Sequence, residues 1–512
     1  MVVLRLAWDR FGSVARQTLP LPPVSWIRTP QSVVVRWHGG KISQTFHLDN
    51  LFSAYRHLPP YHSHYSAEND GEKSAVNIAA RSKTPSTGRK SSRGDCLEDD
   101  VACPNDEGTV QIDVLNPHLK FVEWRHRFGP IYTAHLPKPT VVIAGADELK
   151  HYLDDEIESR AALSGRPKSF VFHAFMRHSK EFGDGIILSH GSQSAILWRR
   201  FAHQQLASFG MHKGTLEEKV RLNLEDLLDE YDSAMEDRDQ LAVDLAQDLT
   251  FCIGNIIHDV VIGRTFQRGD PELKEWKLSL EEIERHEKNL NLDREPTDYM
   301  EAYLQDKARK GELVNKLTLA LNAGDLWTGG LETSVSTLRW AVLHMLHQPH
   351  LQERLFAEID IELNGTLVTY ADHQHMPYTR AFIMELQRVS NVLPWSIPHM
   401  TTRSTRIGGY EIPEGTRVMP QYGAAMLDGA IFSDPEHFEP TRHLDPKSGE
   451  FRPHTRRCLG EPIAKVEIFV ILVTMVQKYE FLPDGAVPSM AHSHGITNTP
   501  APFTCILRKR RS

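Results

Sequence analysis

The sequence predicts a mainly α, helix-rich α+β fold in which small sheets accompany one large helical core. From Trp198 onward, long segments repeat apolar residues at the three- and four-residue spacing of amphipathic helices. Between Met400 and Val418 the pattern changes to short strand-like pieces separated by Gly and Pro turns. The 512 residues are 40% hydrophobic and 24% charged, which is typical of a globular chain with a sizeable core.

Individual elements follow from the same spacing. Order begins near Asn116, and a first helix is predicted over 119–128, where Gly129-Pro130 ends it. Two short strands are predicted over 131–136 and 140–144, around a Pro-Lys-Pro turn. Further helices are predicted over 216–234, 241–261, 317–346, 352–363, 379–389 and 461–479, with a last strand over 504–507.

The chain divides into three parts by composition. Residues 1–65 are mixed, rich in proline and without a clear periodic pattern, so they form a divergent segment of unknown structure. Residues 66–110 are rich in Ser, Lys, Asp, Glu and Gly, and this composition predicts a disordered polar linker because it buries too little apolar surface. Residues 111–512 are expected to form one helical domain.

Composition also excludes several classes. The net charge of -9 is mild for this length and does not indicate nucleic-acid binding. The 5 cysteines are scattered without a CxxC pair, which argues against a zinc site or a disulfide framework and favours a reducing compartment. The longest apolar run, 468–476, is too short to cross a membrane, and Met1–Arg10 lacks a signal-peptide core, so no transmembrane anchor is expected.

Cys458 carries the most informative motif. Arg456 precedes it by two residues, Gly460 follows by two, and a helix begins directly behind. A thiolate is stabilised by a nearby cation and by the N–H groups of a helix N-terminus. Glycine allows a large flat ligand to approach the backbone. A buried structural cysteine is the alternative interpretation of this stretch alone.

Polar residues inside predicted helices form further candidates. Glu332 and Thr333 follow Gly329-Gly330 within the helix over 317–346, where glycine and hydroxylated residues are poor helix formers. One interpretation is a bulge that faces a ligand, with an acid and an alcohol that pass protons. The other is close helix packing at the glycines with a solvated Glu332. Glu385 and Arg388 share a helix face, and Arg442 offers a second cation for a buried network. Such pairs are usually exposed on the surface.

Two other basic residues are weaker candidates. His399 follows an apolar, proline-stiffened stretch over 391–398 that suits the wall of a pocket, although an ordinary turn histidine is the simpler interpretation. Arg199 lies beside Trp198 and Arg200 at a predicted helix start, where a solvated basic face is the simpler interpretation.

Taken in order, these motifs resemble the cytochrome P-450 superfamily of haem-thiolate monooxygenases, in particular its microsomal animal members that metabolise drugs and lipids. The resemblance covers roughly 112–512. Its motifs include Phe128-Gly-Pro-Ile-Tyr-Thr, Gly329-Gly-Leu-Glu-Thr-Ser, Glu385-Leu-Gln-Arg, Asp434-Pro-Glu-His-Phe-Glu-Pro-Thr-Arg and Arg456-Arg-Cys-Leu-Gly-Glu. It implies a helix-rich triangular prism with small sheets, and haem between a long central helix and the cysteine-bearing loop.

The resemblance also implies residue roles. Cys458 matches the axial ligand of the haem iron, and Glu332 with Thr333 matches the acid–alcohol pair that guides protons to dioxygen. Residues that match the holders of the haem propionates are Arg199, His399 and Arg456. Residues that match the structural triad behind the haem are Glu385, Arg388 and Arg442.

By the same resemblance, the cofactor is haem b and the enzyme inserts one atom of O2 into a lipophilic substrate such as a xenobiotic, fatty acid or steroid-like molecule. Electrons come from an NADPH-cytochrome reductase. The expected location is the cytosolic face of the endoplasmic reticulum membrane, with membrane association implied by the family alone.

Departures from the family pattern support an alternative, a haem-binding protein with impaired turnover. His454 stands where the family has glycine, and the segment before Arg456 is short, leaving Phe451 at the place of the phenylalanine under the haem. Ala195 replaces a tryptophan of the family. The N-terminal anchor is replaced by unrelated sequence, and the stretch between Phe266 and Pro296 is short.

Overall fold

A computed structural model of the chain contains two compact units, Met1–Val76 and Asn77–Ser512. The described residues are 24–29, 32–37, 43–47, 112, 117–136, 138–154, 162–167, 185–187, 193–210, 215–270, 280–444, 458–493 and 497–510. The predicted linker over 66–110 lies outside them.

The first unit contains an antiparallel sheet that the sequence interpretation did not expect. Strands β1 (Val24–Thr29), β2 (Ser32–Trp37) and β3 (Ser43–His47) pair in the order β1-β2-β3. The run Ser-Val-Val-Val-Arg-Trp in β2 is rich in β-branched residues, which favour strands. This local signal was masked by the many prolines nearby.

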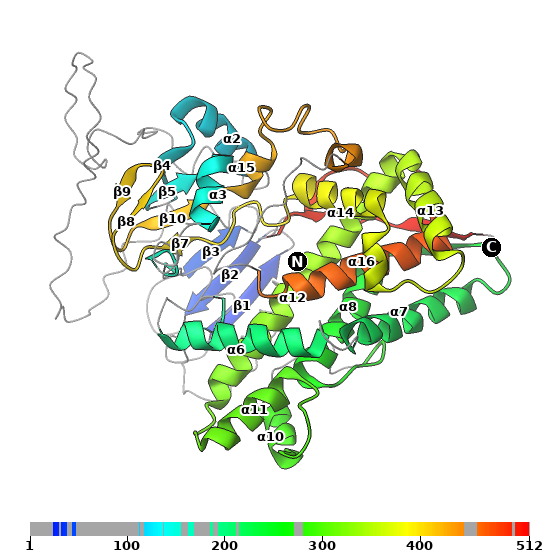
Figure 1. Ribbon diagram of the computed structural model, residues 1–512, viewed down its shortest axis with the longest axis horizontal. Helices are drawn as coiled ribbons and strands as arrows, with labels where there is room; N and C mark the ends of the chain where they lie inside the picture. The colour runs from blue at the N-terminus through cyan, green and yellow to red at the C-terminus, as the bar shows by residue number, and fades with distance from the viewer. Residues whose placement is uncertain are drawn as a thin grey trace. The chain divides into compact units, whose positions relative to one another are not determined.

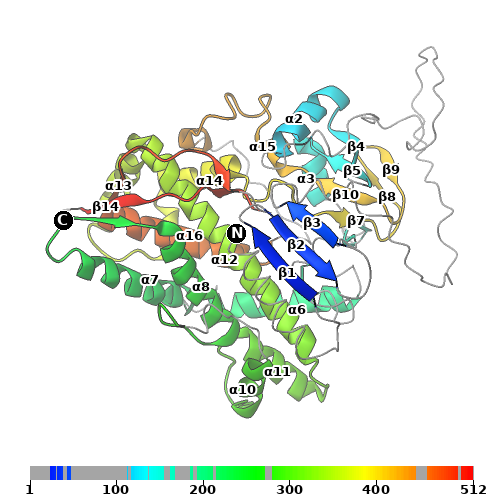
Figure 2. The same ribbon diagram turned by 180° about the vertical axis from the view of Figure 1, so that it is seen from behind.

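In the second unit, a four-stranded mixed sheet contains both predicted N-terminal strands. Strands β4 (Ile131–His135) and β5 (Pro139–Ile143) pair antiparallel, β10 (Arg417–Pro420) lies parallel to β5, and β7 (His399–Met400) pairs with β10. The short pair β8 (Thr405–Ile407) and β9 (Tyr410–Ile412) completes the predicted strand-rich region. Figures 1 and 2 show helices α2, α3 and α15 beside this sheet.

Helices form the larger part of this unit (Figure 1). Their bounds are α2 Pro117–Phe128, α3 Ala146–Asp154, α6 Gln193–Gly210, α7 Thr215–Ala234, α8 Leu245–Ile262, α10 Leu280–Lys288, α11 Tyr299–Lys310, α12 Lys316–His347, α13 Pro349–Leu363, α14 Pro377–Ser390, α15 Tyr422–Met426 and α16 Glu461–Lys478, with 3-10 turns η5 Tyr370–Gln374 and η6 Pro440–His443. The predicted helix-rich fold with small sheets is confirmed.

Helix α12 is the centre of the helical core. It packs against α8, α16, α14 and α13, and its residues from Ser334 to Leu346 are all buried. A Cβ atom at Gly330 would lie 2.7 Å from Cδ1 of Ile257, so glycine allows α8 and α12 to pack closely here. The helix runs unbroken through this region, without the predicted bulge.

One predicted helix begins later than expected. The sequence interpretation placed a helix over 241–261, but residues Gln240–Val243 form strand β6, and α8 begins at Leu245. Strand β6 pairs with β14 (Cys505–Lys509), which also pairs with β11 (Tyr479–Pro483). Asp244 ends the strand because its side chain accepts a hydrogen bond from the N–H of Ala246 and caps α8.

Helix α8 is long and apolar enough to cross a membrane by length and composition. It packs against α12 and α7, and most of its side chains are buried in the core. These contacts are those of a core helix.

The cap of α8 gives a first prediction. Replacing Asp244 with Ala removes the acceptor for the N–H of Ala246 and for the Gln247 side chain, so the free energy of unfolding should fall by about 1 kcal/mol. Urea denaturation of the purified protein measures this change. Asp237→Ala, in the exposed turn before β6, is the control and should leave the stability unchanged.

Candidate functional site

Cys458 lies at the beginning of α16, as the sequence predicts. Gly460 is the N-cap, and the helix starts at Glu461. Burial by surrounding atoms raises the pKa of the Cys458 thiol, whereas the N–H groups of Gly460 and Glu461 and the charge of Arg199 act in the opposite direction. The side chain is nevertheless accessible to solvent. A ligand can therefore reach the sulfur atom.

Arg199 lies on α6, within electrostatic reach of the cysteine and of Asp325 on the central helix. Its guanidinium donates to the carbonyl of Ile186 at 3.4 Å. Burial lowers the pKa of Arg199, while the Cys458 thiol and the Asp325 carboxylate act to raise it, so all three groups are within electrostatic reach. Arg199 is half-buried and Arg200 is exposed. The solvated basic face therefore describes Arg200 and not Arg199.

His399 lies in β7 and is buried, so it is not an ordinary turn histidine. Its Nδ1 lies 2.8 Å from the carbonyl oxygen of Leu163. Because a carbonyl oxygen only accepts, Nδ1 carries a proton and donates it to this hydrogen bond. Nε2 is the other ring nitrogen.

A second arginine, Arg166, contacts the residues directly before His399, and the sequence interpretation missed it. Its guanidinium donates to the carbonyls of Ile397 at 3.2 Å and Pro398 at 2.8 Å, directly before His399, and to the carbonyl of Ile187 at 3.2 Å. Burial and the nearby Arg199 charge lower the pKa of Arg166 to about 10. Two guanidinium groups are thus held close together in a poorly solvated place.

Asp325 on α12 organises the segment that joins these arginines. Its Oδ2 accepts the N–H groups of Ile186 and Ile187 at 2.8 and 2.9 Å. The carbonyls of the same two residues accept from Arg199 and Arg166. One buried carboxylate therefore sets the position of a turn, and the turn sets the position of two cations.

The middle of α12 presents the predicted acid–alcohol pair. Residues 326–333 keep accessible surface, whereas the helix is fully buried from Ser334 to Leu346. Gly329 is exposed, and the Thr333 hydroxyl donates to its carbonyl at 2.7 Å. Glu332 is half-buried, and its Oε1 accepts from Thr497 at 2.7 Å, so it is not the freely solvated side chain of the alternative interpretation.

The Glu385 network is buried, as the family resemblance implies and contrary to the usual surface pair. Arg388 donates to both carboxylate oxygens of Glu385, at 2.7 and 2.8 Å, and Arg442 donates at 2.9 Å. His443 adds a contact of 2.8 Å that was not predicted. Burial alone would raise the pKa of Glu385, but these bonds outweigh it and lower the pKa to about 2.

Glu467 is a further buried acid that the sequence interpretation missed. It lies on α16 and its Oε2 accepts from Ser334 of α12 at 3.0 Å. Burial raises the pKa of Glu467 to about 7, so the group can hold a proton near neutral pH. Its position in the apolar helix over 463–476 was the available signal, since an acid there must be buried with a partner.

Several predicted features lie outside the described residues. These are Arg456, His454 and Phe451, while Ala195 belongs to α6 but its side chain is not described. The roles implied for them stay predictions.

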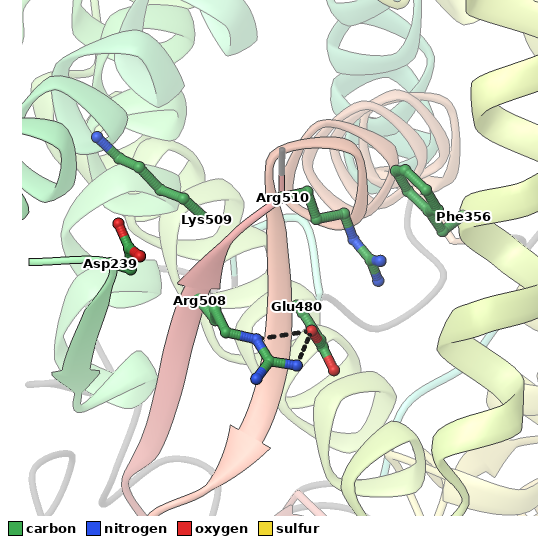
Figure 3. A pocket seen from close by; sticks show the side chains of 6 residues that line it. All are labelled: Asp239, Phe356, Glu480, Arg508, Lys509 and Arg510. Carbon is green, nitrogen blue, oxygen red and sulfur yellow. Dashed lines mark hydrogen bonds and ion pairs between the residues drawn. The ribbon is translucent and has the colours of Figure 1, made fainter. Parts of the chain in front are cut away.

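A surface pocket of about 400 Å³ contains none of the predicted residues. Figure 3 shows its lining, Asp239, Phe356, Glu480, Arg508, Lys509 and Arg510. Its charges serve the local structure, since Arg508 pairs with Glu480 and Lys509 pairs with Asp232. The pocket lies beyond the C-terminal end of α16, a helix about 27 Å long with Cys458 at its other end.

The arrangement as a whole is that expected of a thiolate-ligated oxygenase: a helix-terminal cysteine, clustered arginines and an accessible acid–alcohol pair on a central helix. The sequence model of the family described as Cytochrome P450 matches residues 109–283 and 276–507. The chain belongs to the cytochrome P450 family, and it is a P450 monooxygenase.

Individual relatives agree with this family. The chain is 28% identical to a 3-ketosteroid oxygenase of Caenorhabditis elegans over 77% of this chain and 76% of that protein. It is 30% identical to cytochrome P450 2M1 of Oncorhynchus mykiss over 73% of this chain and 83% of the relative. A zebra fish cytochrome P450 solved with progesterone superposes with a TM-score of 0.67, at 25% identity, over 77% of this chain and 99% of the other.

The family implies a haem cofactor, and the described residues fit one. The Cys458 thiol is accessible and meets two helix N–H groups, which suits an iron ligand. The pKa of Arg166 is lowered by burial and by Arg199, so an anionic group between the two would stabilise both. Haem carries such anionic groups in its propionates.

The Glu385 network gives a prediction about stability. In Glu385→Gln the charge between Arg388 and Arg442 is lost, and the free energy of unfolding should fall by about 3–5 kcal/mol. Urea denaturation measures it. Glu480→Gln, in the partly exposed pair with Arg508, should change stability by less than about 1 kcal/mol. Equal changes in the free energy of unfolding for Glu385→Gln and Glu480→Gln would show that the buried network contributes no more stability than a partly exposed ion pair.

The same network makes stability depend on pH. The folded-state pKa of Glu385, about 2, lies below its ordinary value of 4.5, so its contribution is present above pH 4.5 and is lost as the pH falls toward 2. Glu385→Gln should lack this part of the acid sensitivity.

Proposed function

We propose that this P450 is a haem-thiolate monooxygenase that binds haem b through Cys458. The observation that carries the proposal is the accessible Cys458 thiol at the N-terminus of α16, within reach of the Arg199 charge. Haem supplies the dioxygen chemistry when bound, inserting one oxygen atom into the substrate. The remaining tasks belong to the residues of the chain.

The cations hold the propionates in this proposal. Arg199 and Arg166 lie close together, and His399 follows the two carbonyls that accept from Arg166. Guanidinium groups bind carboxylates by paired, charge-assisted hydrogen bonds. Arg456 completes the set by resemblance.

Glu332 and Thr333 move protons on the accessible stretch of α12. Thr333 is held by its own helix through the Gly329 carbonyl, and Glu332 by the C-terminal segment through Thr497. An acid beside an alcohol can take a proton from solvent and pass it inward. Glu385, Arg388 and Arg442 form the structural triad, and their buried bonds support this assignment.

The substrate is a lipophilic molecule, and we propose a steroid-like, fatty-acid or xenobiotic compound. Relatives support the steroid-like class, since one is named a 3-ketosteroid oxygenase and two zebra fish structures hold progesterone and abiraterone. The electron donor is an NADPH-cytochrome reductase, and the enzyme works at the cytosolic face of the endoplasmic reticulum membrane. Both proposals rest on the animal relatives.

The alternative, a haem-binding protein with impaired turnover, rests on the sequence departures near the cysteine. Haem incorporation without NADPH-dependent product across a panel of lipophilic compounds would support it. Turnover of any member of the panel would exclude it.

A carbon monoxide difference spectrum tests the ligand. The reduced wild-type protein should give the red-shifted Soret band for which the family is named, because a thiolate ligand pushes electron density onto iron. Cys458→Ala should abolish this band. Cys505→Ala, buried in β14, should keep it. Retention of the band in Cys458→Ala would refute the ligand assignment.

The role of Asp325 gives a second test. Asp325→Ala frees the N–H groups of Ile186 and Ile187, so the turn that positions Arg199 and Arg166 should loosen and haem affinity should fall about tenfold. Haem titration of the apoprotein, followed by Soret absorbance, measures the affinity. Asp360→Ala, exposed on α13, should bind haem like the wild type. An unchanged affinity in Asp325→Ala would exclude a positioning role for this carboxylate.

A further inference from the structure

The Glu332 carboxylate is held by a residue far away in the sequence. Thr497, which is 7% exposed, donates its hydroxyl to Glu332 Oε1 at 2.7 Å. The C-terminal segment over 497–500, which includes strand β13 (Thr499–Pro500), therefore reaches the proton-handling part of α12. Neither the family motifs in this sequence nor the helix spacing of α12 pointed to this contact.

The contact belongs to a chain of four side chains. Thr497 Oγ1 lies 3.2 Å from Thr499 Oγ1, which lies 2.7 Å from Ser336 Oγ. The chain thus runs from Glu332 through two threonines and returns to α12 at Ser336. Ser336 is fully buried.

The spacing of residues along α12 and along the C-terminal segment fits this chain of side chains. Glu332 and Ser336 are four residues apart on one helix face, a rise of about 6 Å. Thr497 and Thr499 are two residues apart, Thr497 in a bend and Thr499 in β13, and their hydroxyl oxygens lie 3.2 Å apart. The two neighbouring hydroxyls therefore reach both residues of α12 at once, Thr497 at Glu332 and Thr499 at Ser336.

Asn498 holds the extended segment in place between the two threonines. Its N–H donates to the carbonyl of Val392 at 2.9 Å, and its carbonyl accepts from Trp340 Nε1 at 2.8 Å. Its side-chain amide donates to the carbonyl of Ser390. The segment is thus fixed to α12 and to the end of α14, so the threonine hydroxyls contact α12 at a defined position along the helix.

An ionised Glu332 sets the direction of the whole chain. A carboxylate can only accept, so Thr497 must donate to it, and the lone pairs of Thr497 and Thr499 are then free to accept in turn. Hydroxyls that all donate toward one charge strengthen one another. Because Glu332 is half-buried, the bond at Oε1 leaves the carboxylate with accessible surface.

We propose that Thr497 is a positioning residue for Glu332, with Thr499 and Ser336 completing a hydroxyl chain that keeps the carboxylate in one orientation. This inference rests on the proposed function, in which Glu332 handles protons. A hydrogen bond to a charged group favours one orientation of a side chain about tenfold or more. Without it, Glu332 turns away from the proton path for part of each catalytic cycle.

Thr497→Val tests the inference, because valine keeps the shape and loses the hydroxyl. The carbon monoxide spectrum should be that of the wild type, while a larger share of the reducing equivalents from NADPH should leave as hydrogen peroxide instead of product. The pH profile of this share should also change. Thr497→Ser should restore wild-type values, and Thr499→Val should give a smaller shift in the same direction.

The matched control is Thr504→Val. Thr504 also donates to a carboxylate, Asp484 Oδ2 at 2.8 Å, in the same C-terminal segment but at an exposed position outside the site. It should leave the peroxide share and its pH profile unchanged. A peroxide share and pH profile in Thr497→Val equal to the wild type would overturn the proposal.

Hydrogen exchange provides a readout without turnover. In the haem-loaded protein without substrate or reductant, the amides of 497–499 and of 330–336 should exchange several-fold faster in Thr497→Val than in both the wild type and Thr504→Val. Unchanged exchange would overturn the hydroxyl chain even if the enzyme proves inactive. If Thr497→Val exchanges faster as expected but the wild-type protein does not give the red-shifted band, the result counts against the proposed function and not against the hydroxyl chain.

Discussion

The constraint on which the structure depends is the burial of polar groups along the central helix α12. Each of these groups requires a partner from another part of the chain, because an unpaired polar group in the core is costly. Asp325 accepts from the turn over 185–187, Ser334 donates to Glu467, and Ser336 pairs with Thr499. One helix thus fixes the relative positions of the turn over 185–187 that contacts the arginines, of α16 behind the cysteine and of the C-terminal segment.

These partners also divide α12 into a sealed half and an accessible stretch. From Ser334 to Leu346 the helix is buried, and Ser334, Ser336 and Arg339 bond to partners in other parts of the chain. Residues 326–333 keep accessible surface, and the acid–alcohol pair lies at the end of this stretch, next to the sealed half. Glu332 and Thr333 are therefore accessible enough to exchange protons and close enough to packed structure to be held in place. A location further toward the C-terminal end of α12 would lose the access to solvent.

Much of the fold and part of the site could be predicted from the sequence, for identifiable reasons. Helices such as 317–346 have a strong apolar period, and motifs such as Glu385-Leu-Gln-Arg388 lie close together in the chain. Arg166, Asp325 and Thr497 were missed because their partners are distant in sequence, such as Ile397 for Arg166 and Glu332 for Thr497. Strand β6 was missed because its pairing with β14 overrides the helical pattern of residues that continue into α8.

The described residues that come before and after Cys458 in the chain are both held in buried structure. On the N-terminal side, Arg442 and His443 are bonded to the buried Glu385, which Arg388 holds from α14. On the C-terminal side, the thiol is followed at once by α16, whose residues from Val466 to Val476 are buried. The departures at His454 and Phe451 fall between these two anchors. Moving the thiol would therefore require displacing α16, a core helix that begins three residues after it.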